Sequence, residues 1–127
     1  MQPGSPPAQF NLGTALTMAG RLDEAVKAFR AALAKRPGYA QAHNNLGRVL
    51  LAQGKTAEAI REMQEAVRLD PANAQAFFGL SEAYAGIGSF DLAVAMADRA
   101  LRLSPEEPLA TEIRRKRDEY LQRRPPG

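Results

Sequence analysis

The residue types that most often carry out chemistry in proteins are scarce in this chain of 127 residues. It has no cysteine and a single histidine, His43. Without cysteine there is neither a disulfide framework nor a thiolate metal site nor a thiol nucleophile. A lone histidine with no second ligand beside it favours a packed structural role over catalysis or metal binding. We therefore expect no enzyme activity and no cofactor.

Two further patterns resemble chemical sites and fail on inspection. Gly54-Lys55-Thr56 has the end of a phosphate-binding loop, but that loop needs a glycine five residues before Gly54, and Val49 stands there. Several acidic residues are expected at the starts or on the outer faces of helices, where negative charge complements the helix dipole. They do not share a pocket as catalytic carboxylates would. These residues are Asp23, Glu24, Glu58, Asp91 and Asp98.

The net positive charge of the chain comes from its C-terminal end. The formal net charge is +3, yet residues 114 to 127 hold six basic residues against Asp118 and Glu119, so residues 1 to 113 carry −1. The run Arg114-Arg115-Lys116-Arg117 would suit an anionic partner. Acidic neighbours dilute it on the same helix, so we expect a solvated face and, by default, neither nucleic acid nor membrane as a partner.

The composition is that of a globular helical protein. Apolar residues make up 45% of the chain, with aromatic residues at 6% and no tryptophan. No segment reaches the apolar length that a membrane helix needs, and residues 1 to 7 have no basic start or apolar run. We expect a cytoplasmic location.

A fixed offset of 34 residues organises the chain. At this offset three alanine columns, one leucine, one glycine and one proline column recur: Ala8/Ala42/Ala76, Leu12/Leu46/Leu80, Gly20/Gly54/Gly88, Ala25/Ala59/Ala93, Ala32/Ala66/Ala100 and Pro37/Pro71/Pro105. A unit this short cannot bury an apolar face alone, so the copies must stack. The chain therefore contains three tandem repeats.

Each repeat is predicted to be a pair of helices. Apolar residues recur at helical spacing on either side of the glycine column. Glycine tolerates the left-handed conformation that ends a helix, so Gly20, Gly54 and Gly88 should end the first helix of each pair. The proline column should end the second helix, because the residue before a proline is pushed out of helical geometry.

These residues resemble the tetratricopeptide repeat, whose pattern has an alanine and Leu-Gly in the first helix, glycine at the turn, two alanines in the second helix and a proline after it. Leu12-Gly13 and Leu46-Gly47 match, and Leu80-Ser81 departs by one small residue. The resemblance implies an all-α, right-handed superhelical solenoid. Repeat two, with His43-Asn44-Asn45-Leu46-Gly47, is similar to repeats of O-linked N-acetylglucosamine transferase and of bacterial proteins of this family.

The expected boundaries follow from the repeat. Residues 1–6 form a linker, residues 7–107 form three repeats (about 6–39, 40–73 and 74–107), 108–122 a capping helix and 123–127 a tail. Small residues in the Gly13, Ala25 and Ala32 columns let helices approach, and large residues fill the gaps, Leu12 among them. In the cap, one apolar stripe should cover repeat three: Leu109, Ala110, Ile113, Tyr120 and Leu121.

The resemblance also implies that first helices line a concave groove, where an extended peptide binds. By that resemblance the groove residues are Phe10, Asn11, Thr14 and Thr17, then Gln41, Asn44, Asn45, Arg48 and Leu51, then Gln75, Phe78, Gly79 and Glu82. Asn11 and Asn45 share one column, and a side-chain amide pairs with any peptide backbone. Phe10 and Phe78 are candidate apolar anchors. Arg48 and Glu82 are expected to pair with each other.

The family's carboxylate clamp for Hsp70 and Hsp90 tails is not expected. The corresponding residues are Phe10, Thr14, Asn45, Gln75 and Gly79, which lack every cation. We therefore interpret the chain as a protein interaction scaffold that binds an extended peptide or a partner helix. The alternatives are the substrate-recognition domain of a larger enzyme or secretion complex, electrostatic binding through the basic helix, and self-association.

Overall fold

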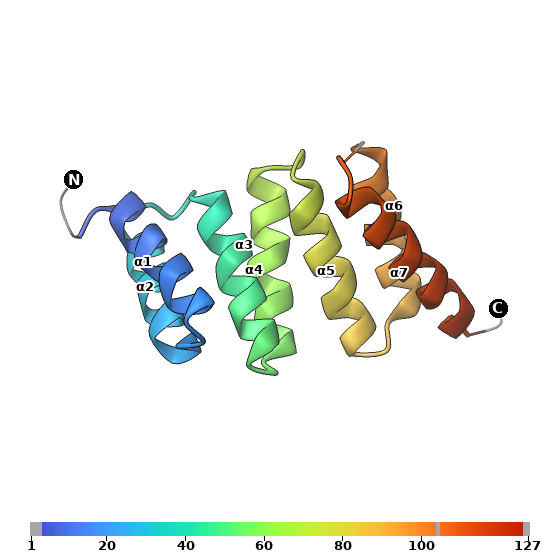
Figure 1. Cartoon of the computed structure of the whole chain (residues 1–127), viewed down its shortest axis with the longest axis horizontal. Coiled ribbons are helices and arrows are strands. Elements are labelled where there is room, and N and C mark those ends of the chain that lie inside the picture. The colour runs from blue at the N-terminus through green and yellow to red at the C-terminus, as the bar shows by residue number, and fades with distance from the viewer. Residues whose placement is uncertain (1–3, 104, 126–127) are drawn as a thin grey trace. The chain divides into compact units, whose positions relative to one another are not determined.

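The computed structural model describes residues 4–103 and 105–125, which form helices and connecting turns (Figure 1). The parts of the expected linker at 1–3 and of the tail at 126–127 lie outside the described residues. The helices are α1 (Pro6–Met18), α2 (Leu22–Lys35), α3 (Ala40–Ala52), α4 (Thr56–Leu69), α5 (Ala74–Gly86), α6 (Phe90–Arg102) and α7 (Leu109–Arg123). The fold is an all-α helical repeat.

The chain divides into two compact units. Unit 1 runs to Leu69 and contains α1 to α4, while unit 2 starts at Asp70 and contains α5 to α7. The first two repeats therefore lie in unit 1, and the third repeat lies in unit 2 with α7. Each unit is described by itself.

The glycine column ends the first helix of every repeat, as predicted. Gly20, Gly54 and Gly88 have φ angles of 77°, 80° and 80°, in the left-handed region. After Gly20, the N–H of Arg21 donates to the carbonyl oxygen of Leu16 at 2.9 Å, which closes the helix end with the bond pattern of a Schellman motif. Lys55 and Ser89 donate in the same way to Leu50 and Tyr84.

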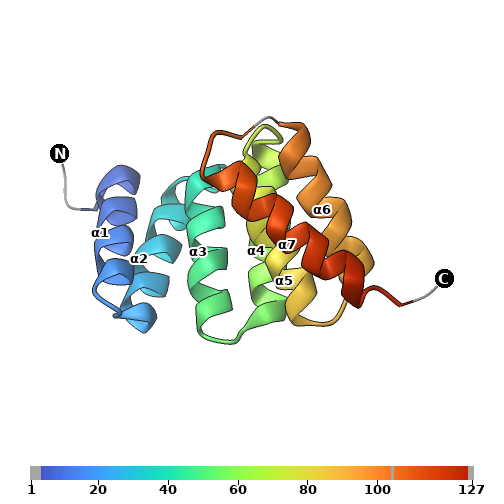
Figure 2. The same ribbon diagram turned by 45° about the vertical axis from the view of Figure 1, so that its right-hand side comes forward.

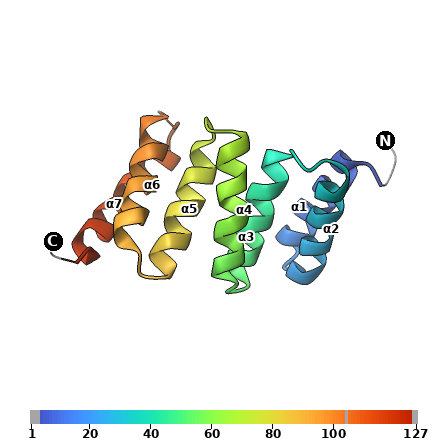
Figure 3. The same cartoon turned by 180° about the vertical axis from the view of Figure 1, so that it is seen from behind.

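In unit 1 the helices form two layers. The views from the front and from behind place α1 and α3 in one layer and α2 and α4 in the other (Figures 1 and 3). Side chains of α2, α3 and α4 meet between the layers in one core: Ala25, Val26, Phe29, Leu46, Val49, Leu50 and Ala59. The first helices therefore share one face of the unit.

The two helices of a repeat approach so closely that one side must lack a side chain. A Cβ atom added to Gly13 would lie 2.7 Å from the Phe29 ring, and one added to Gly47 would lie 2.7 Å from Cγ of Met63. In repeat three the equivalent of Phe29 and Met63 is the small Ala97, and the equivalent of the two glycines is Ser81. Ser81 is fully buried and donates a hydrogen bond to the Ala93 carbonyl oxygen at 2.6 Å. Its departure from the Leu-Gly pattern is thus matched by a smaller residue on the facing helix.

In unit 2, α7 packs along α6 (Figure 2). Ala110, Ile113 and Tyr120 are buried, and the Tyr120 ring lies 6.2 Å from that of Phe90. Burial, followed by the negative charges of Glu82 and Glu119, raises the pKa of Tyr120 to about 12.

The first and last helices begin within one residue of their expected starts. α7 begins at Leu109. α1 begins at Pro6 after the N-cap residue Ser5, whose hydroxyl accepts a hydrogen bond from the N–H of Ala8.

Two residues assigned to packing are exposed instead. Leu12 is 48% exposed, whereas Leu46 in the same column is 1% exposed. Leu46 lies in the core with residues of α2, the second helix of the preceding repeat. Among the described residues, no helix takes that place beside Leu12. Leu121 is 39% exposed, because Tyr120 takes the buried place on α7 and the next residue points about 100° away around the helix.

Across the described residues, no helix is both long enough and apolar enough to cross a membrane.

The seam in repeat two gives a first prediction. Gly47→Ala should gain up to ~1 kcal/mol of helix propensity but lose ~1–3 kcal/mol to overpacking against Met63, so the net effect is destabilising. Gly38→Ala is the matched control, since an added Cβ there meets nothing within 4 Å. Urea unfolding followed by circular dichroism measures both. In a Met63→Ala background, the stability lost on Gly47→Ala should shrink or become a gain. An unchanged loss of stability would show that the Met63 side chain is not what the added Cβ atom meets.

The start of α7 gives a pH prediction. The Thr111 hydroxyl, then the Thr111 N–H and Arg114, hold the pKa of Glu107 below its ordinary 4.5. The N–H of Thr111 donates to Glu107 at 2.8 Å. A lowered carboxyl pKa adds stability above pH 4.5 that is lost as the pH falls below it. The difference in melting temperature between the wild type and Glu107→Gln should therefore be present near pH ~6 and shrink progressively as the pH falls below 4.5.

The control for this measurement is Glu112→Gln, an exposed acid in the first turn of the same helix. It should show a smaller difference from the wild type both above and below pH 4.5. A Glu107→Gln difference that persists unchanged at low pH would contradict the capping role of the carboxylate.

Candidate functional site

Helices α1 and α3 of unit 1 carry most of the predicted groove residues, and some of these side chains lie on the face that the two helices share. The two helices contact each other. Asn11 on α1 and Gln41 and Arg48 on α3 are exposed, while Thr14 and Asn45 are half-buried. Neither Asn11, Asn45 nor Arg48 has a hydrogen bond or ion pair within the described part of unit 1. We call these three side chains and the helix surface between them the α1/α3 face.

The amides of Asn11 and Asn45 differ in this respect from other amides in the chain. Asn73 uses its side-chain oxygen to accept from the N–H of Ala76 at 3.1 Å, which caps α5. Gln53 donates to a carboxyl oxygen of Asp23 at 2.6 Å. Asn11 and Asn45 have no such internal role, so each keeps a donor and an acceptor for another molecule.

Two threonines of the predicted groove use their hydroxyl groups internally. Thr14 donates to the carbonyl oxygen of Phe10 at 3.1 Å, and Thr17 donates to that of Gly13 at 2.7 Å. Threonine in a helix commonly bonds the carbonyl four residues back in this way. Their contribution to the face is therefore a methyl group and a hydroxyl oxygen that can still accept a hydrogen bond.

The column that contains Phe10 and Asn44 faces packed surroundings, which corrects the prediction of exposed groove residues there. The Phe10 ring stacks on Tyr39 at 5.2 Å and meets the edge of Phe29 at 5.8 Å, so it is already packed within unit 1. Asn44 is only 4% exposed, and its side-chain oxygen has no partner among the described residues. Leu51, also expected in the groove, packs against the core.

The remaining predicted groove residues belong to unit 2. Gln75 is exposed, Gly79 is buried, and Phe78 is only 6% exposed, so Phe78 is not the exposed anchor that its position suggested. Glu82 is half-buried and close enough to Tyr120 to raise the pKa of that side chain. Its expected pairing with Arg48 joins different units and stays a prediction.

Comparison with known proteins identifies the family. A family model described as tetratricopeptide repeat matches residues 1–40, 10–74 and 44–108. These matches cover most of the chain. The chain belongs to the tetratricopeptide repeat family.

Two solved structures that match this chain have a similar fold. The crystal structure of MamA superposes with a TM-score of 0.77 at 29% sequence identity, and the match covers 81% of this chain and 60% of MamA. The chain thus spans less than two thirds of the MamA chain. The TPR2B domain of yeast Sti1, in a complex with pHsp70, gives a TM-score of 0.89 at 21% identity over 94% of this chain and 98% of that one. No curated protein matches the sequence.

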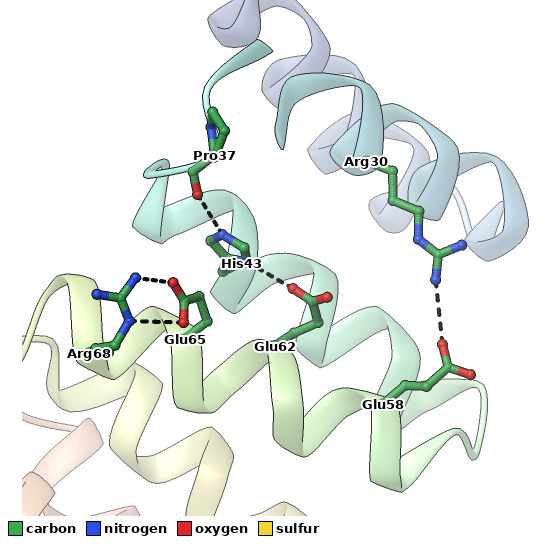
Figure 4. Close-up of polar contacts among 7 residues, drawn as sticks. All are labelled: Arg30, Pro37, His43, Glu58, Glu62, Glu65 and Arg68. Carbon is green, nitrogen blue, oxygen red and sulfur yellow. Dashed lines mark hydrogen bonds and ion pairs between the residues drawn. The ribbon is translucent and has the colours of Figure 1, made fainter. Parts of the chain in front are cut away.

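The single histidine holds the second tetratricopeptide repeat together. His43 on α3 lies between the loop after α2 and helix α4 (Figure 4). Its Nε2 donates to the Pro37 carbonyl oxygen at 2.8 Å, and its Nδ1 lies 2.8 Å from a carboxyl oxygen of Glu62. Because both ring nitrogens are engaged, His43 has a structural position in which neither nitrogen is open to a substrate or metal.

Acidic side chains of unit 1 are likewise engaged in pairs. Arg30 on α2 donates to Glu58 on α4 at 3.4 Å, and Arg68 bonds Glu65 on the same helix (Figure 4). The Arg68 hydrogen bond lowers the pKa of Glu65. Within residues 4–103 and 105–125, no three His, Cys, Asp or Glu side chains gather in a way that could hold a metal ion.

The basic helix α7 neutralises much of its own charge. Arg114 pairs with Glu107, Arg115 with Glu119, and Arg117 with both Asp98 and Asp118. Arg124 pairs with Asp91, and Arg123 lies over the Phe90 ring at 4.8 Å. An anionic partner would have to compete with these contacts.

Sequence reasoning missed the polar contacts that join the first two repeats. Asp23 to Gln53 and Arg30 to Glu58 connect the second helix of repeat one with repeat two. Their separations of 30 and 28 residues are close to one repeat length, and that is the signal which would have found them. They show which side of α2 faces the next repeat.

The position of His43 gives a stability prediction. His43→Ala should lower the free energy of unfolding by ~1–3 kcal/mol, because it leaves the Pro37 carbonyl and the Glu62 carboxylate without this partner. Urea unfolding measures the change, and Gln41→Ala, an exposed substitution on the same helix, should change it by less than ~0.5 kcal/mol. Equal effects of the two substitutions would show that the histidine bridge does not stabilise the fold.

Proposed function

We propose that this protein is an interaction module that holds an extended peptide of a partner protein against the α1/α3 face. Tetratricopeptide repeats mediate protein–protein interactions, which supports the general class. The observation that carries the specific proposal is the pair Asn11 and Asn45. They occupy equivalent positions on two contacting helices, reach solvent, and have no hydrogen-bonding role within unit 1.

An amide at each of these positions suits a peptide backbone more than a particular side chain. A carboxamide offers one acceptor and two donors, which match the N–H and C=O groups of an extended chain. Two such groups one repeat apart would fix the direction of the peptide. Arg48, exposed and without a partner in unit 1, adds a preference for an acidic side chain next to the contacted backbone.

The chaperone-tail clamp is not part of the proposal. The Sti1 domain with the same fold is described in a complex with pHsp70. At the positions that form the family's clamp this chain has Phe10, Thr14, Asn45, Gln75 and Gly79, none of which is a cation. A shared fold does not transfer a ligand when the residues that bind it are absent.

Two alternatives make different demands. A role as the substrate-recognition part of a larger enzyme or secretion complex would use the same α1/α3 face, so the experiment below tests the face for both. Electrostatic binding of nucleic acid or membrane through α7 is less favoured, since its arginines already have acidic or aromatic neighbours. The cytoplasm remains the proposed compartment.

Mutation of the two asparagines tests the proposal. Peptides selected by the full chain from a random displayed library are synthesised, and their dissociation constants are measured by fluorescence anisotropy. Asn11→Ala with Asn45→Ala should weaken binding by about five-fold to 150-fold, because loss of two hydrogen bonds is worth ~1–3 kcal/mol. Helicity should be unchanged, since neither side chain belongs to the core.

Two controls accompany this measurement. Gln122→Ala removes an exposed amide on α7 and should leave the affinity unchanged. Charge reversal of Arg114, Arg115 and Arg117 should alter the affinity little, and only at low salt, where surface charges are poorly screened. Normal binding by the asparagine double mutant together with loss of binding in the arginine triple mutant would transfer the site to α7.

A further inference from the structure

A second surface of unit 1 is exposed where the same surface of the next repeat is covered. Leu12 is 48% exposed and Ala15 is exposed, while their equivalents Leu46 and Val49 are 1% and 2% exposed. The residue types are apolar in both repeats. The difference lies in what covers them, because α2 packs against α3 and the outer side of α1 has no equivalent helix among the described residues.

The contact between α2 and repeat two shows what kind of helix fits this surface. Val26 on α2 enters the core with Leu46 and Val49. Four residues later, Arg30 reaches across to Glu58 at 3.4 Å. The covering helix thus presents an apolar residue and, one turn further on, an arginine.

The surface of repeat one preserves the corresponding partners. A shallow groove of about 480 Å³ lies there, lined by Gln9, Leu12, Leu16, Glu24, Lys27 and Ala28. Glu24 is the equivalent of Glu58, the acid that receives Arg30, and it is exposed. Ala19 stands in place of Gln53, so the polar contact that Asp23 makes in repeat two has no counterpart here.

We propose that this groove is a docking site for an α-helix of a partner protein, and that the helix carries a large apolar residue followed four positions later by an arginine. The apolar residue covers Leu12 and Leu16, and the arginine pairs with Glu24. In the free chain Glu24 bonds Arg21 at 2.8 Å, but both side chains are exposed, and an exposed pair of this kind is weak enough for another arginine to replace.

A second copy of the chain does not supply such a helix. Val26 and Arg30 are already engaged in unit 1, and their equivalents in the later repeats lack the arginine, with Ile60 before Gln64 and Val94 before Asp98. Two other pairs with this spacing begin on α7, and the first residue of each is buried in unit 2: Ile113–Arg117 and Tyr120–Arg124, the latter ending at the C-cap residue of the helix. None of the described helices therefore supplies the occupant, and a helix of a separate protein is the occupant proposed.

The chain's own covering helix provides a probe for the groove. A fluorescent peptide with the sequence of residues 20–36 carries a staple that joins positions 24 and 28, on the side of the helix away from Val26 and Arg30. The staple preforms the helix and so avoids the ordering cost of a short peptide. Its binding to the full chain is measured by anisotropy. Leu12→Glu should weaken binding ten-fold or more.

Matched substitutions make the test specific. Leu92→Glu changes a leucine of nearly the same exposure, 47%, in unit 2 and should leave the affinity unchanged. In the peptide, Arg30→Glu should weaken binding by about two- to five-fold, and Glu24→Arg in the protein should restore it, whereas Asp23→Ala in the peptide should have no effect. If Leu12→Glu alters the fold, the exchange of charges between Arg30 of the peptide and Glu24 of the protein still tests the groove.

Three results would overturn the proposal. The peptide could fail to bind at about millimolar concentration, or bind the Leu12→Glu chain as well as the wild type, which would indicate exchange with α2 itself. If the unmodified chain forms a dimer and Leu12→Glu makes it a monomer, a second copy of the chain occupies the groove. Because Asn11 and Asn45 lie outside the groove lining, failure here leaves the α1/α3 face unaffected.

Discussion

The closeness of the two helices within each repeat is the constraint on which the rest of the structure depends. In unit 1 the first helix has glycine where the second has a large side chain, and the Gly13–Phe29 and Gly47–Met63 approaches leave no room for a Cβ atom. In unit 2 the small Ala97 allows Ser81 in the glycine's place. Because interiors are close-packed, the size of one residue at this seam sets the size of its partner.

That seam also determines which side chains are left for binding. Residues of α1 and α3 that point toward the second helices are buried, and those that point away form the α1/α3 face with Asn11, Asn45 and Arg48. The backbone of both helices is fixed by packing, so the two amides are held one repeat apart, as the proposed peptide contact requires. Preorganisation of this kind lowers the entropic cost of binding. The outer groove around Leu12 derives from the same repetition, since it is the surface that another repeat would cover.

Much of the fold could be predicted because single residues determine it locally. Gly20, Gly54 and Gly88 end helices through their left-handed backbone, and the 34-residue offset gives the helix pairs. Exposure was harder to predict, since it depends on the neighbouring repeat and not on the residue itself. Leu12 and Leu46 are the same residue in the same column, and only one is covered. The column pattern likewise gave no indication that Phe10 stacks on Tyr39 or that Asn44 is buried.

The most direct test of the account asks whether the Asn45 amide pairs with a partner's backbone. In a selected peptide, each backbone N–H is replaced in turn by N–CH₃, and affinities are measured for the wild type and for Asn45→Ala. The account predicts one peptide position at which methylation weakens binding to the wild type but has little effect on Asn45→Ala, with a coupling free energy of ~0.5–1.5 kcal/mol. Methylation costs that are the same for both proteins at every position would contradict it.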